Sequence, residues 1–343
     1  MTAMPALPHP SRVLTVVPCL NEAAHIAALL TCLLSDPANT RIVVADGGST
    51  DGTRRIVRAM AQENARVVLL DNPDRIQSAG INRAVARFGE QATWLARVDA
   101  HCLYPQDYVS RLVAIAETQG VDSVVVRMET RAARGFARGV AAAQNSRLGT
   151  GGAAHRTGAA AGLVEHGHHA LMRIGAFRAA GGYCEAMACN EDAELDLRML
   201  ARGARIWLAP EVPVTYFPRG TARGLLRQYL RYGEGRATTV RRHRRRLRLR
   251  QALPLAIAPA CGLALAAPLQ PAFALPAVGW ALLCQGWGLG LAIRERRADV
   301  ALSGSAAMIM HLGWSAGYWK QAIVARVSGG RSIPAPVLPF AAS

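Results

Sequence analysis

The chain has 343 residues, of which 51% are hydrophobic and 18% charged. This balance excludes a wholly disordered protein, because it supplies ample apolar material for a packed core. The formal net charge is +17, and because Lys320 is the only lysine the excess is almost entirely arginine, which indicates an anionic partner.

The N-terminal residues 1–10 have no basic segment and no apolar core of the length that a secretory signal needs. We therefore expect no such signal and a protein whose bulk stays in the cytosol. The seven cysteines form no CxxC pair and no zinc-ligand spacing, so we expect reduced, structural thiols.

From residue 12 to about residue 126, short β-branched runs alternate with segments of helical periodicity. This alternation predicts an α/β fold with a mostly parallel, doubly wound sheet. In such sheets ligands lie beyond the carboxyl ends of the strands. The predicted strands are 13–17, 41–45, 66–70, 93–98 and 122–126, and the predicted helices are 23–34, 51–63, 77–88 and 105–118.

Residues 131–165 are rich in Gly, Ala and Arg, and the pattern predicts no regular element there, only a loop that could cover a site. After this stretch, an acidic start at Asn190 predicts a helix that stops near Gly203, and 205–208 is a short predicted strand. We expect the catalytic domain to span 1–220.

The C-terminal part predicts a membrane-associated region. Residues 221–250 are expected to form an amphipathic helix at the membrane surface, with eight arginines and no acid between 236 and 250. Residues 251–330 follow as membrane-associated helices, with a hairpin at 253–293 and a further apolar stretch at 300–319 whose path is left open.

Basic residues flank both ends of the predicted hairpin. The positive-inside rule therefore places the catalytic domain on the cytosolic face of the cytoplasmic membrane. The alternative is a buried helical subdomain. The arginine block next to this apolar region favours an anionic membrane surface over a nucleic acid as the partner, and we expect no nucleic-acid partner.

Two motifs follow successive predicted strands. The first strand ends in Pro18-Cys-Leu-Asn21-Glu22, and the second in Asp46-Gly-Gly-Ser-Thr-Asp-Gly-Thr53. Together they resemble the opening motifs of glycosyltransferase family 2, over roughly residues 12–236. The resemblance implies a GT-A fold and a nucleotide-sugar donor.

Asp46 is expected to accept a hydrogen bond from the imide N–H of uracil. Gly48 would allow the backbone to come close to the nucleotide, and Ser49 or Thr50 is a candidate cap of the next helix. An ordinary βα turn with an N-cap is the structural alternative. The resemblance also places Pro18, Asn21, Glu22, Asp71, Gly80 and Asn82 near the nucleotide.

The fourth strand leads into Asp99-Ala-His101, where the family usually has an Asp-x-Asp pair that binds a divalent cation. The resemblance therefore implies Mn²⁺ or Mg²⁺ bound by Asp99 and His101. Imidazole is a good ligand for manganese and a poorer one for magnesium, which leaves the metal open. His101 could equally be a surface residue with no ligand role.

The acidic pair Glu191-Asp192 matches the family's carboxylates near the acceptor. An inverting transfer needs a base for the acceptor hydroxyl, and Asp192 is the first candidate, with Glu191 the second. Favourable charge at a helix N-terminus is the alternative, and it is the only role expected for Glu194 and Asp196.

Residues 228–232 resemble a Gln-x-x-Arg-Trp motif of the family, with Tyr232 in place of tryptophan. Gln228 and either Arg231 or Arg236 are therefore expected at the diphosphate of the donor, where negative charge grows. Alternatively both arginines belong to the basic helix. Glu165, His166, His168 and His169 lack the spacing of a zinc motif and are expected to line a polar pocket.

The resemblance implies inverting transfer of a hexose, with glucose as the first candidate, from a UDP-sugar to a lipid-linked saccharide acceptor in exopolysaccharide or cell-surface glycan synthesis. Within the family the motifs look most like bacterial glycosyltransferases of succinoglycan-type assembly. Two alternatives are a processive membrane polysaccharide synthase, which needs more membrane helices than this chain offers, and a non-enzymatic polyanion-binding membrane protein.

Overall fold

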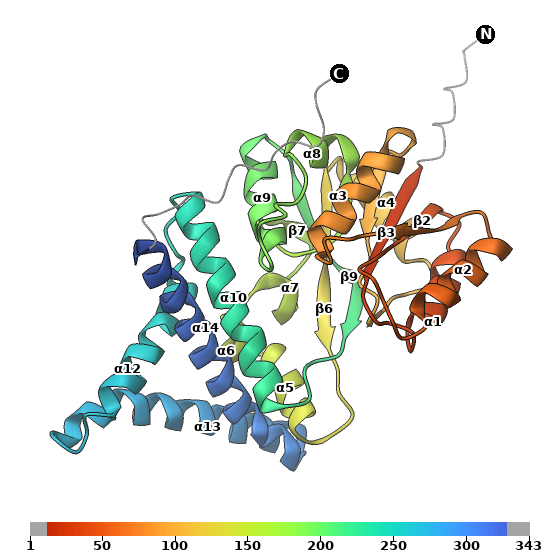
Figure 1. Cartoon of the computed structure of the whole chain (residues 1–343). Helices are drawn as coiled ribbons and strands as arrows, with labels where there is room; N and C mark the ends of the chain where they lie inside the picture. The colour runs from red at the N-terminus through yellow and green to blue at the C-terminus, as the bar shows by residue number, and fades with distance from the viewer. Residues whose placement is uncertain (1–11, 328–343) are drawn as a thin grey trace, which may run out of the picture.

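The computed structural model describes residues 12–327, and a sheet with helices on both sides forms the upper half of the molecule in Figure 1. Four strands at one side of this sheet run parallel in the order β3-β2-β1-β4. They are β1 (Val13–Cys19), β2 (Asn39–Asp46), β3 (Val67–Asp71) and β4 (Trp94–Arg97). The helices that follow them are α1 (Ile26–Ser35), α2 (Thr53–Glu63), α3 (Gln77–Phe88) and α4 (Tyr108–Gln119).

The other half of the sheet is mixed rather than parallel. β8 (His168–Arg173) lies antiparallel between β4 and β6 (Ser123–Thr130), and β9 (Ile206–Tyr216) runs parallel to β6. Two short strands, β5 (Cys102–Leu103) and β7 (Gly162–Leu163), pair antiparallel with β9. Because β8 is antiparallel to both β4 and β6, strands β6 and β9 run in the same direction as the first four. The sheet is therefore mostly parallel, as predicted, and β8 with the short β5 and β7 runs in the opposite direction.

The segment 131–165 is not the loop that its composition predicted. It folds into α5 (Gly135–Gln144), α6 (Arg147–Thr150), α7 (Ala154–Thr157) and then β7. The glycines and alanines that hid this helical pattern allow close packing, since Val140 and Ala143 of α5 are buried together with Met310 from the C-terminal region.

Helix α10 (Ala222–Arg242) lies along α14 (Leu302–Val327), and both run diagonally through the lower half of Figure 1. Small residues make this approach close: a Cβ atom at Gly317 or Gly233 would collide with the backbone of the other helix. The apolar residues of α10, such as the fully buried Leu225, therefore face α14. We had expected them to face a bilayer surface, but α14 already covers them.

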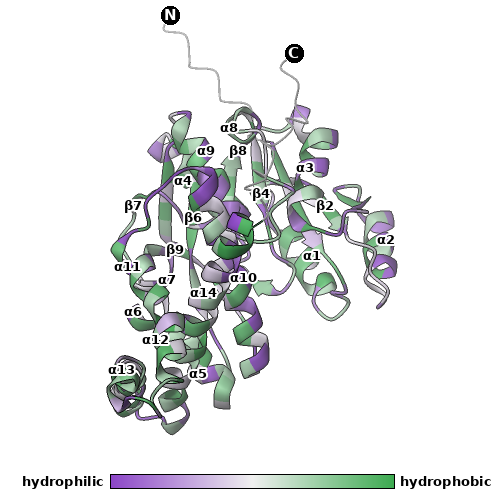
Figure 2. Cartoon of the chain, turned by 60° about the vertical axis from the view of Figure 1, so that its left-hand side comes forward, coloured by the Kyte–Doolittle hydropathy of each residue, from purple (hydrophilic) through white to green (hydrophobic). Residues whose placement is uncertain are grey.

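Helices α12 (Ile257–Ala264) and α13 (Leu275–Glu295) form the end of the molecule away from the sheet, and the short helix α11 (Leu249–Ala252) leads into them. Among the described residues, one helix, Pro271–Glu295, is long and apolar enough to cross a membrane, and only 11% of its apolar window is buried. Large side chains such as Leu265, Leu269 and Leu283 are exposed there, and Figure 2 shows α12 largely in the colours of apolar residues. Such exposed apolar surface marks a partner or a membrane.

Helix α8 (Ile174–Ala179) and α9 (Glu191–Ala201) complete the fold beside the sheet. Buried side chains of both helices, Phe177, Leu195 and Met199, pack with Leu14 and Leu95 of the parallel strands. This core fixes the start of α9 relative to the carboxyl end of β4. The acidic pair at residues 191 and 192 is thereby brought toward Asp99.

Candidate active site

The segment after β1 is fastened to the loop after β2. The backbone N–H of Asn21 donates to Ser49 Oγ over 2.8 Å, and Asn21 Oδ1 accepts from the Thr50 N–H over 2.9 Å. Asn21 has a φ of 57°, a left-handed conformation that asparagine tolerates better than most residues. Pro18 is the penultimate residue of β1, just before this segment.

Asp46 organises the glycine-rich loop. Its Oδ2 accepts from the N–H groups of Gly48 and Ser49 over 3.0 and 3.1 Å, and from Arg54 Nη1 over 2.7 Å. Burial opposes the charge, but these hydrogen bonds lower the pKa of Asp46 below its usual range. Gly48 has a φ of 85°, which a side chain would strain.

Direct contact of Asp46 with uracil stays a prediction. The hydrogen bonds that Oδ2 already makes restrict how the carboxylate could reach the base. Within the described residues, Oδ1 of Asp46 has one weak partner, the Cys19 thiol at 3.7 Å. The neighbouring strand end carries Asp71, whose side chain is 75% exposed and binds the same Arg54 over 2.6 Å. Arg54, which the motif did not single out, thus joins the two carboxylates at this edge.

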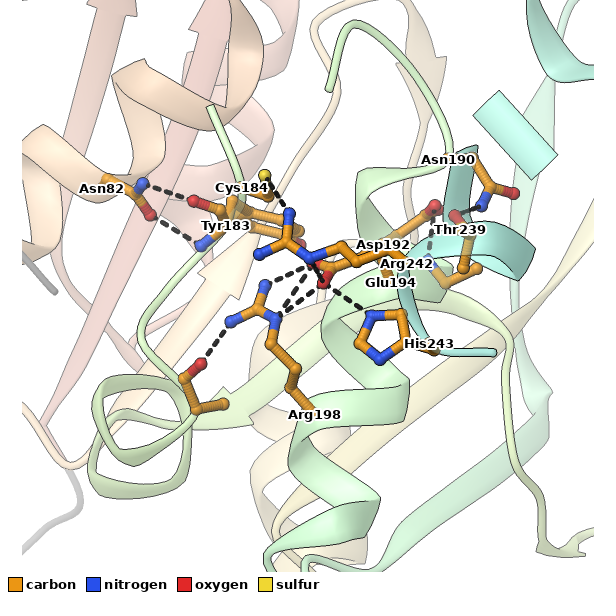
Figure 3. A network of polar contacts seen from close by, with 12 residues as sticks. Asn82, Tyr183, Cys184, Asn190, Asp192, Glu194, Arg198, Thr239, Arg242 and His243 are labelled. Carbon is orange, nitrogen blue, oxygen red and sulfur yellow. Dashed lines mark hydrogen bonds and ion pairs between the residues drawn. The ribbon is translucent and has the colours of Figure 1, made fainter. Parts of the chain in front are cut away.

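Gly80 and Asn82 of α3 support the site through packing. A Cβ atom at Gly80 would lie 2.9 Å from the Asn72 amide and 3.0 Å from Ala45. Asn82 donates to the Tyr183 carbonyl over 2.9 Å and accepts from the Tyr183 N–H over 2.9 Å (Figure 3). The amide of Asn82 therefore holds the turn before α9, and its predicted proximity to the nucleotide stays a prediction.

Asp99 lies just beyond β4, between the side chains of Arg97 and His168. Both contacts are long for ion pairs. Its Oδ1 is 3.5 Å from Arg97 Nε, and its Oδ2 is 3.6 Å from His168 Nε2. Burial opposes ionisation, but Arg97, His168 and His101 together lower the pKa of Asp99. Burial also lowers the pKa of His168 to about 4. Asp99 is therefore charged at neutral pH, beside a neutral imidazole.

His101 lies at the rim of the same region. Its Nδ1 is 3.3 Å from Glu22 Oε1, and its side chain is 47% exposed. Within residues 12–327, no group of three or more His, Cys, Asp or Glu side chains is placed to hold a metal by itself. One or two protein ligands completed by substrate phosphates is the usual arrangement for Mg²⁺. Asp99 can supply one such carboxylate, and metal binding by Asp99 and His101 stays a prediction.

Arg97 connects Asp99 to the acidic start of α9. This buried guanidinium is 3.3 Å from Glu191 Oε1 and donates to the Tyr183 hydroxyl over 3.2 Å. Burial and the charge of Asp192 raise the pKa of Glu191, and Arg97 only partly offsets them. Glu191 is thus engaged with Arg97, and Asp192 Oδ1 accepts from the Ala193 N–H over 2.9 Å. The choice of Asp192 as the base stays a prediction.

Glu194 does more than complement the helix dipole. Its fully buried carboxylate binds Arg198 within α9, and it also contacts Arg242 at 3.3 Å and His243 at 2.8 Å from the end of α10 (Figure 3). Asp196 is likewise buried and binds His166 over 2.6 Å. The expectation for both residues was incomplete, because helix periodicity does not reveal which acids face basic residues from distant segments.

Replacing Glu194 with Gln should destabilise the protein by about 3–5 kcal/mol at pH 7, because Arg198 and Arg242 would stay buried without their counter-charge. Its partners lower the pKa of Glu194 from 4.5 to about 2. Since the folded-state pKa is the lower one, this stabilisation is present above about pH 4.5 and is lost toward pH 2. Thermal unfolding of the detergent-solubilised protein between pH 7 and pH 3 measures it.

The exposed Glu90 provides the control for this substitution, since Glu90→Gln should change stability by less than about 0.5 kcal/mol. The gap between the Glu194→Gln variant and the wild type should narrow as the pH falls below 4.5. A gap that stays constant across this range would contradict the role given to the carboxylate.

The residues predicted on α10 divide into three environments. Gln228 donates to the hydroxyls of Tyr216 and Tyr232 over 3.1 and 2.9 Å. Arg231 has an exposed side chain. Arg236 lies close enough to Asp192 for the two charges to interact, and its Nε is buried without a hydrogen-bond partner among the described residues. Arg236 is therefore the arginine of this set that belongs to the site.

Arg97 and Tyr183 are the site residues that the motifs missed. The only sequence signal for Arg97 was a charged residue inside an otherwise apolar strand, two positions before Asp99. A charge in a buried strand needs a partner, and the partners come from a helix almost 100 residues later. Tyr183 followed a Gly-Gly turn that gave no chemical indication.

Comparison with known proteins agrees with this geometry. Residues 15–180 match the family described as "Glycosyl transferase family 2". The chain is 51% identical to the succinoglycan biosynthesis protein ExoA of Rhizobium meliloti (strain 1021) over 310 residues, which is 90% of this chain and 94% of that protein.

Among solved structures, the fold is similar to that of the mannosyltransferase PcManGT from Pyrobaculum calidifontis in complex with GDP-Man and Mn²⁺. The TM-score is 0.61 at 21% identity, covering 92% of this chain and 88% of that one. At this identity the likeness shows the fold, which is GT-A. The chain belongs to glycosyltransferase family 2 and is a glycosyltransferase.

Proposed function

We propose that the protein transfers a hexose, with glucose the first candidate, from a UDP-sugar to a lipid-linked saccharide in exopolysaccharide synthesis, with inversion at the anomeric carbon. The observation that carries this proposal is the joining of Asp99, beyond β4, to the acidic start of α9 by the buried Arg97. The identity to a succinoglycan biosynthesis protein supports the pathway.

In the proposed step, the acceptor hydroxyl attacks the anomeric carbon from the face opposite the diphosphate. A new C–O bond forms, the bond to the diphosphate breaks, and the leaving group departs with the electron pair. Asp192 takes the proton of the hydroxyl. Arg97 keeps Glu191 and Asp99 in fixed positions, so the base and the donor-binding edge stay aligned.

A divalent cation, when bound, would offset negative charge on the leaving diphosphate. Asp99 and His101 are the residues that would hold it. Positive charge on the protein side comes from Arg236, whose Nε has no hydrogen-bond partner within the described residues. The exposed apolar helices α12 and α13 would place this site beside the cytosolic face of the membrane, where a lipid-linked acceptor is available.

The function is tested with membranes that contain the protein, a lipid extract that supplies acceptors, and labelled nucleotide sugars with and without Mn²⁺. The panel contains UDP-glucose, UDP-galactose and GDP-mannose. We expect label to enter the lipid fraction from a UDP-hexose, one sugar per acceptor, and only with a divalent cation. Transfer from GDP-mannose alone would contradict the proposed donor, and a long polymeric product would contradict single-sugar transfer.

A further inference from the structure

A basic cavity of about 390 Å³ lies beside the start of α9. It is lined by residues of α7, β7, α9, α10 and α11, which come from the three chain segments 154–166, 193–197 and 236–251. Figure 2 shows α7 and α11 close to each other on the side of the molecule above α12. The arginine run after α10 therefore folds back over a cavity instead of extending into solvent.

Five arginines line this cavity, and a single acid accompanies them. Glu165 is that acid, and it forms an ion pair with Arg248. Burial lowers the pKa of His155 well below its usual range, so this histidine adds no positive charge at pH 7. The lining arginines are Arg236, Arg245, Arg246, Arg248 and Arg250.

One cation in this cavity, Arg236, is not fully satisfied by the described residues. The Nε of Arg236 is buried and has no hydrogen-bond partner among the described residues. Burial lowers the pKa of Arg236, and the charges of Arg250 and Arg248 lower it further, although Asp192 opposes them. Arginines held close together in this way are suited to an anion that several guanidinium groups can share.

The rim of the cavity continues into apolar surface. Arg250 and Gln251 belong to α11, and the neighbouring Leu249 and Leu253 are 74% and 63% exposed. From there the chain passes into α12 and the exposed apolar residues of α13. A ligand with an anionic head and an apolar tail matches both surfaces, whereas a soluble anion uses only the first.

The opposite wall of the cavity is the site already described. Ala193 and Leu197 of α9 line it, and Ala193 directly follows Asp192. A molecule held in the cavity can therefore extend its non-anionic part toward the candidate base. The donor-binding edge at Asp46 and Asp99 contributes no residue to this lining.

We propose that this cavity binds the phosphate or diphosphate head group of the lipid that carries the acceptor, with the saccharide directed toward Asp192 and the lipid tail along α11 and α12. The inference rests on the proposed function and names the part of the acceptor that the protein recognises. It gives the arginine run a binding role in place of general attraction to a membrane surface.

The test uses the full-length protein in neutral detergent and measures binding of farnesyl diphosphate, inorganic pyrophosphate and UDP by calorimetry. The variant R245Q/R250Q removes two lining arginines. The variant R223Q/R244Q removes the same charge from two exposed arginines outside the cavity. Glutamine keeps most of the side-chain length, and circular dichroism checks that both variants are folded.

We expect R245Q/R250Q to weaken binding of farnesyl diphosphate by about tenfold or more, and R223Q/R244Q to change it by about twofold at most. The affinity for UDP should stay the same in both variants. Pyrophosphate should compete with farnesyl diphosphate but bind more weakly, because it has no apolar tail.

Several results would overturn the inference. Equal loss in both variants would mean non-specific charge attraction, and loss of UDP binding in R245Q/R250Q would assign the cavity to the donor. Pyrophosphate that binds as tightly as farnesyl diphosphate would mean a site for free phosphate. In each case intact UDP binding by the wild type would leave the proposed function standing, whereas wild type that binds no UDP would remove that function separately.

Discussion

Asp192→Asn should lower kcat by about 10²–10⁴-fold, the usual range for loss of a general base, while the affinity for UDP changes little. The amide has the same shape but cannot take the proton of the acceptor hydroxyl. Asp192 stands at the start of α9, where its charge interacts with that of Arg236. Initial rates with a labelled UDP-hexose and UDP calorimetry measure the two quantities separately.

Glu191→Gln is the matched comparison, because it makes the same chemical change at the adjacent residue. Glu191 binds Arg97 over 3.3 Å, so its replacement should disturb the position of Arg97 and, through it, Asp99. We expect a higher KM for the donor and a smaller loss of kcat than in Asp192→Asn. If Glu191→Gln were inactive and Asp192→Asn active, the base would be Glu191.

Asp99→Asn should abolish metal-dependent binding of UDP and lower kcat/KM by about 100-fold or more, since a carboxylate is a far better ligand for a hard cation than an amide. Asp99 is charged at neutral pH because its basic neighbours outweigh burial. Its contacts to Arg97 and His168, at 3.5 and 3.6 Å, are long enough to leave the oxygens available. Titration of Mn²⁺ in the presence of UDP measures the loss.

His101→Asp provides the second arm of this experiment, because it restores the Asp-x-Asp pair that is usual in the family. We expect this variant to retain activity and to shift its preference from Mn²⁺ toward Mg²⁺, since oxygen ligands suit magnesium better than imidazole does. Normal metal dependence in Asp99→Asn, or an unchanged metal preference in His101→Asp, would contradict the respective ligand role.

Much of the fold could be predicted from local patterns. The first four strands and the helix at 77–88 lie where hydrophobic periodicity placed them, because each is decided by residues that are neighbours in sequence. The direction of β8 could not be predicted in this way, since it depends on pairing with β4 and β6. The helices in 131–165 were missed because glycine and alanine give little periodic contrast, although they pack tightly.

The same distinction between local patterns and distant partners applies to the candidate site. Asp46, Asp99 and Asp192 were found because they follow strand ends or start a helix within motifs. Arg97 and Glu194 were not recognised, because their roles depend on partners that folding brings from distant segments. The charge pattern showed an arginine block, but only the fold shows that it encloses a cavity.

The close packing of α10 against α14 has a practical consequence. One part of α10 brings Arg236 close to Asp192, and Leu225 on the same helix packs against the last described helix of the chain. A version ending after residue 220 would lack α10 together with Leu225 and Arg236, and one ending after residue 250 would expose Leu225 by removing α14. A shortened chain of either length would therefore lose packing or a candidate site residue that the full chain supplies.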